Sequence, residues 1–141
     1  MPTTTQLVIT EQSKPGTLAR VASVLGRAGV DIKAFSAPEV SGAGKLRKGT
    51  LRLIVADTER ARVALKAAKI RFHEETALVI GLENKPGALS VVAEHLKEAR
   101  INIISGYYTP SREGGKAIVV LTVSNTKKAT DILQEESLDA F

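Results

Sequence analysis

Two segments of the chain contain a Pro-Gly pair in the same setting and could bind a small anion. They are residues 13–18, Ser-Lys-Pro-Gly-Thr-Leu, and residues 84–89, Asn-Lys-Pro-Gly-Ala-Leu. A helix that begins there presents backbone N–H groups without an intrahelical acceptor and a partial positive charge, which suit a carboxylate or a phosphate. Gly16 and Gly87 have no side chain to keep a ligand from the backbone, and the Asn84 amide can donate to a carboxylate or accept from an ammonium. These groups suit a free amino acid, although a lone Pro-Gly pair could equally serve only to start a helix tightly.

The two segments belong to an internal repeat. The second follows the first after 71 positions, and the same offset pairs Val21 with Val92. Later in the repeat the offset falls to 68, which places three extra residues of the first copy in the Gly-, Ser- and Lys-rich loop 41–48. A repeat of this length exceeds most solenoid units, so we expect two copies of a small domain, at residues 1–74 and 75–141.

Each copy shows the same order of secondary structure elements. Short apolar runs predict strands, and apolar residues at i, i+3, i+4 and i+7 predict amphipathic helices with one buried stripe. The expected strands are residues 7–10, 30–35, 50–56 and 70–75 in the first copy and 77–82, 101–108 and 117–123 in the second. The first helix of each copy is expected from the apolar stripes Leu18 to Ala28 and Leu89 to Ala99. The second helices are expected at residues 59–68 and 127–136. Ser13 and Asn84 are expected to cap the first helix of each copy, with the proline in its first turn. Thr58 and Thr126 are expected to cap the second helices.

The order β-α-β-β-α-β is a split βαβ plan, which is typical of an α+β, ferredoxin-like fold. Right-handed crossovers place both helices on one face of a four-stranded antiparallel sheet. A unit of about 70 residues is only marginally stable alone. Pairing two such units would cover exposed sheet faces or edges, which gives the duplication a physical reason.

The motif residues resemble those of the ACT domain family. That family's motif is an Asp or Asn, any residue, Pro-Gly, any residue and Leu, followed by a helix and a strand that opens Ile-Asn-Ile. Residues 84–89 and 101–103 match it in the second copy, and residues 13–18 and 30–32 correspond to it in the first. The resemblance covers nearly the whole chain, as two tandem ACT domains without an attached catalytic domain.

The resemblance implies a regulatory protein that binds a small effector, most often an amino acid, where two ACT domains meet. In the family the first strand–helix turn contributes backbone amides, and the start of the second strand contributes polar groups. Carried over by motif, the ligand-binding residues are Asn84, Pro86, Gly87, Ala88, Leu89, Asn102 and Ile103 in the second copy and Ser13, Gly16, Thr17, Leu18, Asp31 and Ile32 in the first. Ser13 stands where the family has an acid or amide, so the second copy is the better match. Asp31 replaces the usual Asn and could still hold an ammonium.

The resemblance also implies partners and argues against catalysis. ACT domains in enzymes are regulatory appendages to larger catalytic domains, so we expect no enzyme activity, no catalytic residue and no cofactor here. We expect instead an amino acid effector whose binding tightens the interface, together with a homodimer or a separate partner enzyme that responds to it. Residues 83–87 are similar to the start of the acetohydroxyacid synthase regulatory subunit, which implies a branched-chain amino acid as the ligand.

The composition agrees with a cytoplasmic binding protein. The chain has 141 residues, with 20 Lys and Arg against 15 Asp and Glu, and no Cys. The absence of Cys excludes disulfides, Cys nucleophiles and thiolate metal sites. The two histidines, His73 and His95, have no metal-ligand spacing, so we expect no metal. No apolar stretch approaches the ~18 residues of a membrane span, and the N-terminus lacks the pattern of a secretory signal.

An RNA-binding or protein–protein adaptor module of the same plan is the alternative. RNA-recognition modules stack bases on aromatic side chains of the sheet, and the basic first half of the chain could attract nucleic acid. The strands expected at 50–56 and 117–123 contain no aromatic residue, which argues against nucleic acid. The basic residues also alternate with apolar ones, as on solvated helix faces. Tyr107 and Tyr108, at the end of a strand, could pack at an edge or form a wall of the ligand pocket.

Overall fold

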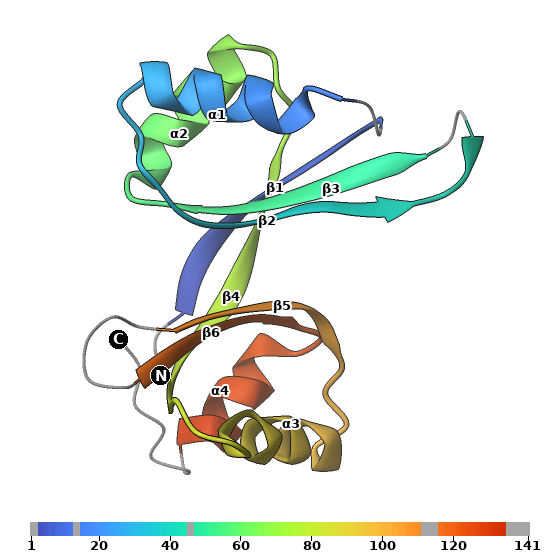
Figure 1. Ribbon diagram of the computed structural model, residues 1–141, viewed down its shortest axis with the longest axis vertical. Coiled ribbons are helices and arrows are strands. Elements are labelled where there is room, and N and C mark those ends of the chain that lie inside the picture. The colour runs from blue at the N-terminus through green and yellow to red at the C-terminus, as the bar shows by residue number, and fades with distance from the viewer. Residues whose placement is uncertain (1–2, 13–14, 45–46, 111–115, 135–141) are drawn as a thin grey trace. The chain divides into compact units, whose positions relative to one another are not determined.

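The computed structural model describes residues 3–12, 15–44, 47–110 and 116–134, and these form six strands and four helices (Figure 1). In chain order the elements are β1 (Thr3–Gln12), α1 (Thr17–Arg27), β2 (Ile32–Ser41), β3 (Lys48–Val55), α2 (Thr58–Ala67), β4 (His73–Glu83), α3 (Ala88–Glu98), β5 (Ile103–Pro110), β6 (Lys116–Val123) and α4 (Thr126–Gln134). The order β-α-β-β-α occurs twice, which confirms the predicted α+β class and the tandem arrangement.

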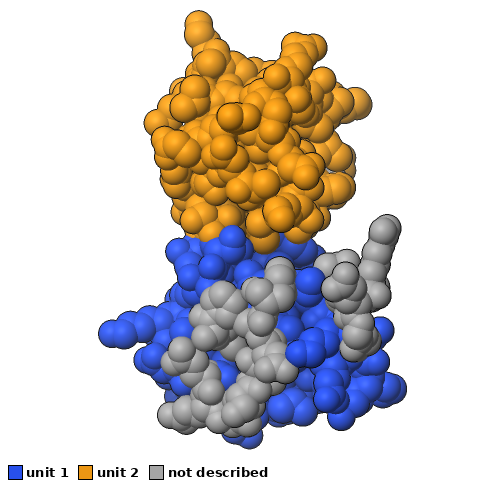
Figure 2. Space-filling view, turned by 90° about the vertical axis from the view of Figure 1, so that its left-hand side faces the viewer, with its two compact units in different colours: residues 1–4, 76–141 blue, residues 5–75 orange. Residues whose placement is uncertain are grey.

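The chain folds into two compact units, which Figure 2 colours separately. One unit is Thr5–Glu75, and the other comprises Thr3, Thr4 and the described residues from Thr76 onward. The chain passes from the first unit to the second inside β4. The domain ranges expected from the repeat, 1–74 and 75–141, stay a prediction.

The last strand expected in the first copy lies later than predicted. The sequence predicts a strand at residues 70–75, but β4 begins at His73. Ile70 instead closes the end of α2: its N–H donates to the Leu65 carbonyl at 2.9 Å, directly after Lys69 adopts a left-handed φ of 59°. The Ile70 side chain is buried in the core, which explains why this apolar position resembles the start of a strand.

Antiparallel pairing places one strand in the middle of three in each unit. β3 pairs with both β1 and β2, and β6 pairs with both β4 and β5. The two registers are equivalent, because Leu7 pairs with Leu53 between β1 and β3 as Leu78 pairs with Leu121 between β4 and β6. The repeat of the sequence is therefore also a repeat of strand pairing.

Each unit has its own apolar core between its strands and its two helices, which lie on one face of the sheet (Figure 1). The helix stripes predicted from the sequence supply Val21 and Leu25 to one core and Val92 and Leu96 to the other, all of them buried. The strand residues of the cores are Leu7, Ile9, Leu51, Leu53 and Val55 in one unit and Leu78, Ile80, Leu82, Val119, Leu121 and Val123 in the other. The first residue of each stripe behaves differently, because Leu18 and Leu89 are 39% and 46% exposed. These two leucines therefore belong to the surface beside the strand–helix turn.

The first helix of each unit begins differently from the prediction. Gly87 is the N-cap of α3 with a left-handed φ of 88°, and no side chain caps the helix. The predictions that Asn84 caps α3 and that a proline occupies its first turn are therefore wrong. Gly16 has the same role in α1, with a φ of 98°, and Ser13 lies outside the described residues. A positive φ strains any residue with a Cβ, which explains why glycine follows the proline in both segments.

The second helices are capped one residue earlier than predicted. Asp57 Oδ1 accepts a hydrogen bond from the Arg60 N–H at 3.0 Å, and Asn125 Oδ1 accepts one from the Lys128 N–H at 3.0 Å. The predictions of Thr58 and Thr126 as caps are wrong, because each threonine is the first residue of its helix. A short carboxylate or amide one position before the helix reaches the third N–H of the helix.

The caps give a direct test of this assignment. Asp57→Ala is expected to lower the free energy of unfolding by about 1 kcal/mol, because it removes the side chain that satisfies an open helix donor. Thr58→Ala, the matched control, is expected to change it by about 0.5 kcal/mol or less. Urea unfolding followed by circular dichroism measures both, and a larger loss for Thr58→Ala than for Asp57→Ala would contradict the cap assignment.

Candidate functional site

The turn between β4 and α3 presents open backbone donors. Lys85 N–H donates to Glu83 O at 2.9 Å, and Ala88 N–H donates to Lys85 O at 3.3 Å. The donor of Ala88 is thus already used inside the turn. The next N–H groups of the helix, those of Leu89 and Ser90, have no backbone acceptor among the described residues. These two N–H groups, at the positive end of the helix dipole, are the ones that can receive an anion.

A tyrosine from another strand lies against this turn. The Tyr108 hydroxyl, near the end of β5, donates a hydrogen bond to Asn84 Oδ1 at 2.7 Å. Because the Asn84 oxygen accepts from Tyr108, the Asn84 amide group turns its N–H donors to the surroundings. Both side chains are exposed, so a ligand can reach them. Sequence analysis left the role of Tyr108 open, and it now joins Asn84 in the candidate site.

The residues at the start of β5 are held by the end of β6. The Asn102 N–H donates to Ser124 Oγ at 2.9 Å, and the Ser124 N–H donates to the Asn102 carbonyl at 2.9 Å. The Asn102 side chain is exposed, and Ile103 is 40% exposed. These two hydrogen bonds hold the Asn102 backbone and thus fix the positions from which the Asn102 and Ile103 side chains extend.

One unit brings some of the predicted residues together and separates others. Asn84, Gly87 and Leu89 lie in one turn, at the N-terminal end of α3. Asn102 follows the C-terminal end of the same helix, which has 11 residues and is therefore roughly 16 Å long at 1.5 Å per residue. Asn102 cannot contact a small ligand that is bound by the turn of its own unit.

The first helix of the other unit begins at the same kind of glycine but beside different side chains. Gly16 is the N-cap of α1, Thr17 is half-buried and Leu18 is exposed. The position equivalent to Tyr108, 71 residues earlier, is Ala37. A hydrogen bond like that from the Tyr108 hydroxyl to Asn84 cannot form there, because the alanine side chain has no hydroxyl group.

The second-strand residues of this unit are anchored in the same way as their equivalents. The Ala56 N–H donates to the Asp31 carbonyl at 2.9 Å. The Asp31 side chain is exposed, while Ile32 is half-buried and packs against the core. Asp31 therefore keeps a carboxylate available to a cation, and Ile32 is mainly a packing residue.

The charges nearest the β4–α3 turn largely balance each other. Lys85 Nζ lies 2.8 Å from Glu83 Oε2, and this hydrogen-bonded carboxylate raises the pKa of the Lys85 amine. Lys85 stays charged at neutral pH, but its charge is paired. An anion at this turn is therefore held by the helix N–H groups and the Asn84 amide rather than by a free lysine.

The described part of the chain contains no group of three or more His, Asp or Glu side chains arranged as metal ligands. His73 Nε2 lies 3.4 Å from Glu75 Oε1, and the other oxygen of this carboxylate lies 3.5 Å from Arg52 Nε. None of the described helices is long and apolar enough to cross a membrane.

Comparison with known proteins identifies the class of protein that this fold and these turns define. A family model described as an ACT domain pair matches residues 2–141. The chain therefore belongs to the ACT domain pair family, and the predicted tandem ACT fold is confirmed. No curated protein sequence matches the chain.

Solved structures of the same fold include proteins from several bacteria. The chain is similar to protein BT0572 from Bacteroides thetaiotaomicron, with a TM-score of 0.84 and 28% identity over 99% of this chain and 92% of that chain. It is also similar to the regulatory subunit of aspartate kinase from Thermus flavus, with a TM-score of 0.59 and 16% identity over 94% of this chain and 88% of that chain. The regulatory subunit of aspartate kinase from Thermus thermophilus, in its ligand-free form, gives a TM-score of 0.55 and 15% identity over 93% and 90% of the two chains. At these lower identities the two aspartate kinase subunits support the fold alone.

Proposed function

We propose that the protein is a non-catalytic regulatory protein that binds a free amino acid at the turn between β4 and α3. The observation that carries this proposal is the uncapped helix N-terminus after Gly87, with the Asn84 amide held beside it by Tyr108. Two structural relatives are regulatory subunits of aspartate kinase, which agrees with a regulatory role. The protein acts in the cytoplasm in this proposal.

The ligand carboxylate binds at the helix N-terminus. The N–H groups of Leu89 and Ser90 and the Asn84 amide N–H group are its donors, and the helix dipole adds a favourable field. Ala88 contributes little through its N–H, because that group donates to Lys85 O. Pro86 and Gly87 shape the turn, and the absence of a Gly87 side chain lets the ligand approach the backbone.

The ligand ammonium is held by a second ACT domain. Asn102 of the same unit follows the far end of an 11-residue helix, roughly 16 Å from the turn, so it cannot serve this ligand. An Asn102 or Asp31 side chain from another domain can supply the acceptor, as the family pattern implies. The ligand therefore lies where two ACT domains meet, either of one chain or of two chains in a homodimer.

Apolar side chains on both sides of the proposed interface favour an aliphatic ligand. Leu89, beside the turn, is 46% exposed, and Ile103, which would come from the second domain together with Asn102, is 40% exposed. Burial of this surface against an aliphatic side chain would add favourable hydrophobic energy. Branched-chain amino acids are the first candidates. Their binding would tighten the interface, and a partner enzyme would respond to that change.

Thermal unfolding against the twenty amino acids tests the proposal. A ligand at 100 times its Kd adds about 2.7 kcal/mol to the stability of the folded state, which raises the midpoint by several degrees. Asn84→Ala is expected to abolish the rise, and Tyr108→Phe is expected to weaken binding by roughly three- to tenfold through loss of one hydrogen bond. Glu98→Gln, at the exposed opposite end of α3, is the matched control and should leave the response unchanged.

A flat panel would reject amino acid binding. The ACT fold would remain, and the alternative of a protein–protein adaptor would then be favoured. Loss of the response in Glu98→Gln but not in Asn84→Ala would reject the site. An RNA-binding role has no specific support, because β3 and β6 contain no aromatic residue for base stacking.

A further inference from the structure

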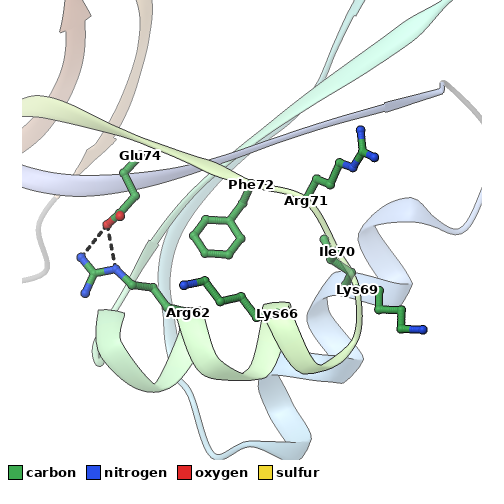
Figure 3. Close-up of a pocket in the computed structure, with 7 residues that line it drawn as sticks. All are labelled: Arg62, Lys66, Lys69, Ile70, Arg71, Phe72 and Glu74. Carbon is green, nitrogen blue, oxygen red and sulfur yellow. Dashed lines mark hydrogen bonds and ion pairs between the residues drawn. The ribbon is translucent and has the colours of Figure 1, made fainter.

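A surface pocket of about 600 Å³ lies in the unit Thr5–Glu75, and no residue of either Pro-Gly turn lines it (Figure 3). It is formed by α2, the segment that connects α2 to β4 and the start of β4. Its lining residues are Arg62, Lys66, Lys69, Ile70, Arg71, Phe72 and Glu74. The volume lies within the range of small-molecule sites.

The lining of this pocket is strongly basic. It contains four cationic side chains and a single carboxylate, which leaves a net formal charge of +3. The carboxylate is already paired: Glu74 Oε1 accepts from Arg62 Nε at 3.0 Å and from Arg62 Nη2 at 2.5 Å, and these bonds lower the pKa of Glu74. Arg62 and Glu74 therefore largely neutralise each other, and the excess positive charge lies elsewhere in the pocket.

Three cations supply that excess. Lys66, Lys69 and Arg71 follow one another along the end of α2 and the connection to β4. Lys69 and Arg71 have no ion-pair partner within the described residues. Glu74 also interacts electrostatically with Lys66, but one carboxylate does not balance four cations, and the net positive charge that remains attracts anions.

The internal repeat lacks these cations in its second copy. At an offset of 68 residues, the second copy has Thr130, Gln134, Ser137 and Asp139 in place of Arg62, Lys66, Lys69 and Arg71. The apolar residues of the same stretch do persist, because Leu65 corresponds to Leu133 and Ile70 to Leu138. The apolar positions are therefore shared by the two copies, whereas the basic ones are specific to the first copy.

An aromatic ring lies at the centre of the pocket. Figure 3 shows the Phe72 ring directed from the segment before β4 toward α2, with the Lys66 amine close to it. Lys69 and Arg71 extend from the turn at the opposite end from the Arg62–Glu74 pair. Phe72 is half-buried against the core, so its position is fixed while part of the ring remains accessible. The pocket thus offers an aromatic area with the Lys66 amine close to it, and two further cations, Lys69 and Arg71, extend from the turn at one end.

We propose that this pocket binds a nucleoside polyphosphate. The phosphates contact Lys66, Lys69 and Arg71, because these side chains combine positive charge with N–H donors. The base lies on the Phe72 ring, since every base has a π-face that can stack on an aromatic side chain. The site is separate from the amino acid site of the preceding proposal and does not depend on it.

Isothermal titration with ATP, tripolyphosphate and adenosine, at about 0.02 M and 0.15 M salt, tests this proposal. ATP is expected to bind more tightly than either fragment, and more weakly at the higher salt concentration. The combined variant Lys66→Gln/Lys69→Gln/Arg71→Gln is expected to weaken ATP binding by at least about tenfold through loss of charge-assisted hydrogen bonds. Phe72→Leu keeps an apolar residue in the core and is expected to weaken ATP binding without affecting tripolyphosphate.

A matched variant separates the pocket from the net charge of the protein. Arg27→Gln/Lys48→Gln/Lys127→Gln removes three exposed cations that do not line the pocket, and it should change ATP affinity by less than about twofold. Equal losses in the two triple variants would overturn the site, as would the absence of ATP binding. Tripolyphosphate that binds as tightly as ATP would overturn the role of Phe72 and of the base. A single-stranded RNA that binds more tightly than ATP and is lost in the pocket variant would overturn a small ligand in favour of nucleic acid.

Discussion

Replacing Leu96 with Ala is expected to destabilise its unit by about 3 kcal/mol, the largest effect of any change considered for this protein. Leu96 is fully buried in α3 and packs in the core of the unit that includes residues from Thr76 onward. Truncation to Ala removes apolar contacts and leaves a cavity that the neighbouring side chains fill only in part. Urea unfolding at a fixed protein concentration measures the change.

Two controls make this result specific. Val91→Ala changes a residue of the same helix that is 50% exposed, and it is expected to change the stability by about 0.5 kcal/mol or less. Leu25→Ala changes the equivalent, fully buried leucine of the other unit and should cost a similar amount there. A loss for Leu96→Ala no larger than that for Val91→Ala would contradict the core assignment.

Replacing Gly87 with Val is expected to cost about 2 kcal/mol of stability, because a β-branched residue would be held at a positive φ. Gly87 has a φ of 88°, and a Cβ built on it meets no atom within 4 Å. The cost therefore arises from backbone strain and not from a clash. Chemical denaturation of the purified variant measures it, with circular dichroism to show that the fold is retained.

A second glycine provides the control for this change. Gly26 lies inside α1 at an ordinary helical φ, and its Cβ would also meet no atom within 4 Å. Gly26→Ala should therefore raise the stability by about 0.5–1 kcal/mol. A Gly87→Val variant as stable as the native protein would show that the left-handed N-cap is not required. Because strain at Gly87 affects both stability and binding, Asn84 is the better position at which to test the ligand.

The sequence was sufficient to predict the elements that depend on periodicity. The apolar stripes through Val21, Leu25, Val92 and Leu96 predicted the buried faces of two helices, and the repeat predicted the equivalent strands. These features are repeated over many residues, so one misplaced residue does not change the prediction. The ACT family assignment, predicted from two copies of one motif, is confirmed by the family model that matches residues 2–141.

The errors concern single residues at the ends of elements. Asp57 and Thr58 are both good capping residues, and only the position of the first helical residue decides which of them caps α2. Ile70 is a single buried apolar residue and shows no periodicity, so the sequence does not distinguish the start of a strand from the end of a helix there. In each case the choice depends on backbone geometry over one or two residues, which composition does not specify.

The least predictable part of the candidate site is the contact between Asn84 and Tyr108. The two residues are separated by a helix and most of a strand, and no sequence pattern relates them. Their contact follows from the register of β5 against β6 and from where β4 ends. The motif identified the turn and its glycine, whereas the side chain that orients Asn84 required the three-dimensional arrangement.

The passage of the chain through β4 has a consequence for how this protein can be divided. The first residues of β4, up to Glu75, belong to the unit Thr5–Glu75, and the rest of β4 belongs to the other unit. That other unit also includes Thr3 and Thr4 from the start of the chain. The unit Thr5–Glu75 thus includes Glu75 from the second copy of the repeat, the other unit includes Thr3 and Thr4 from the first copy, and no linker separates the two units. A cut between residues 74 and 75, where the repeat places the domain boundary, would therefore fall inside β4 and interrupt a strand that contributes to both units.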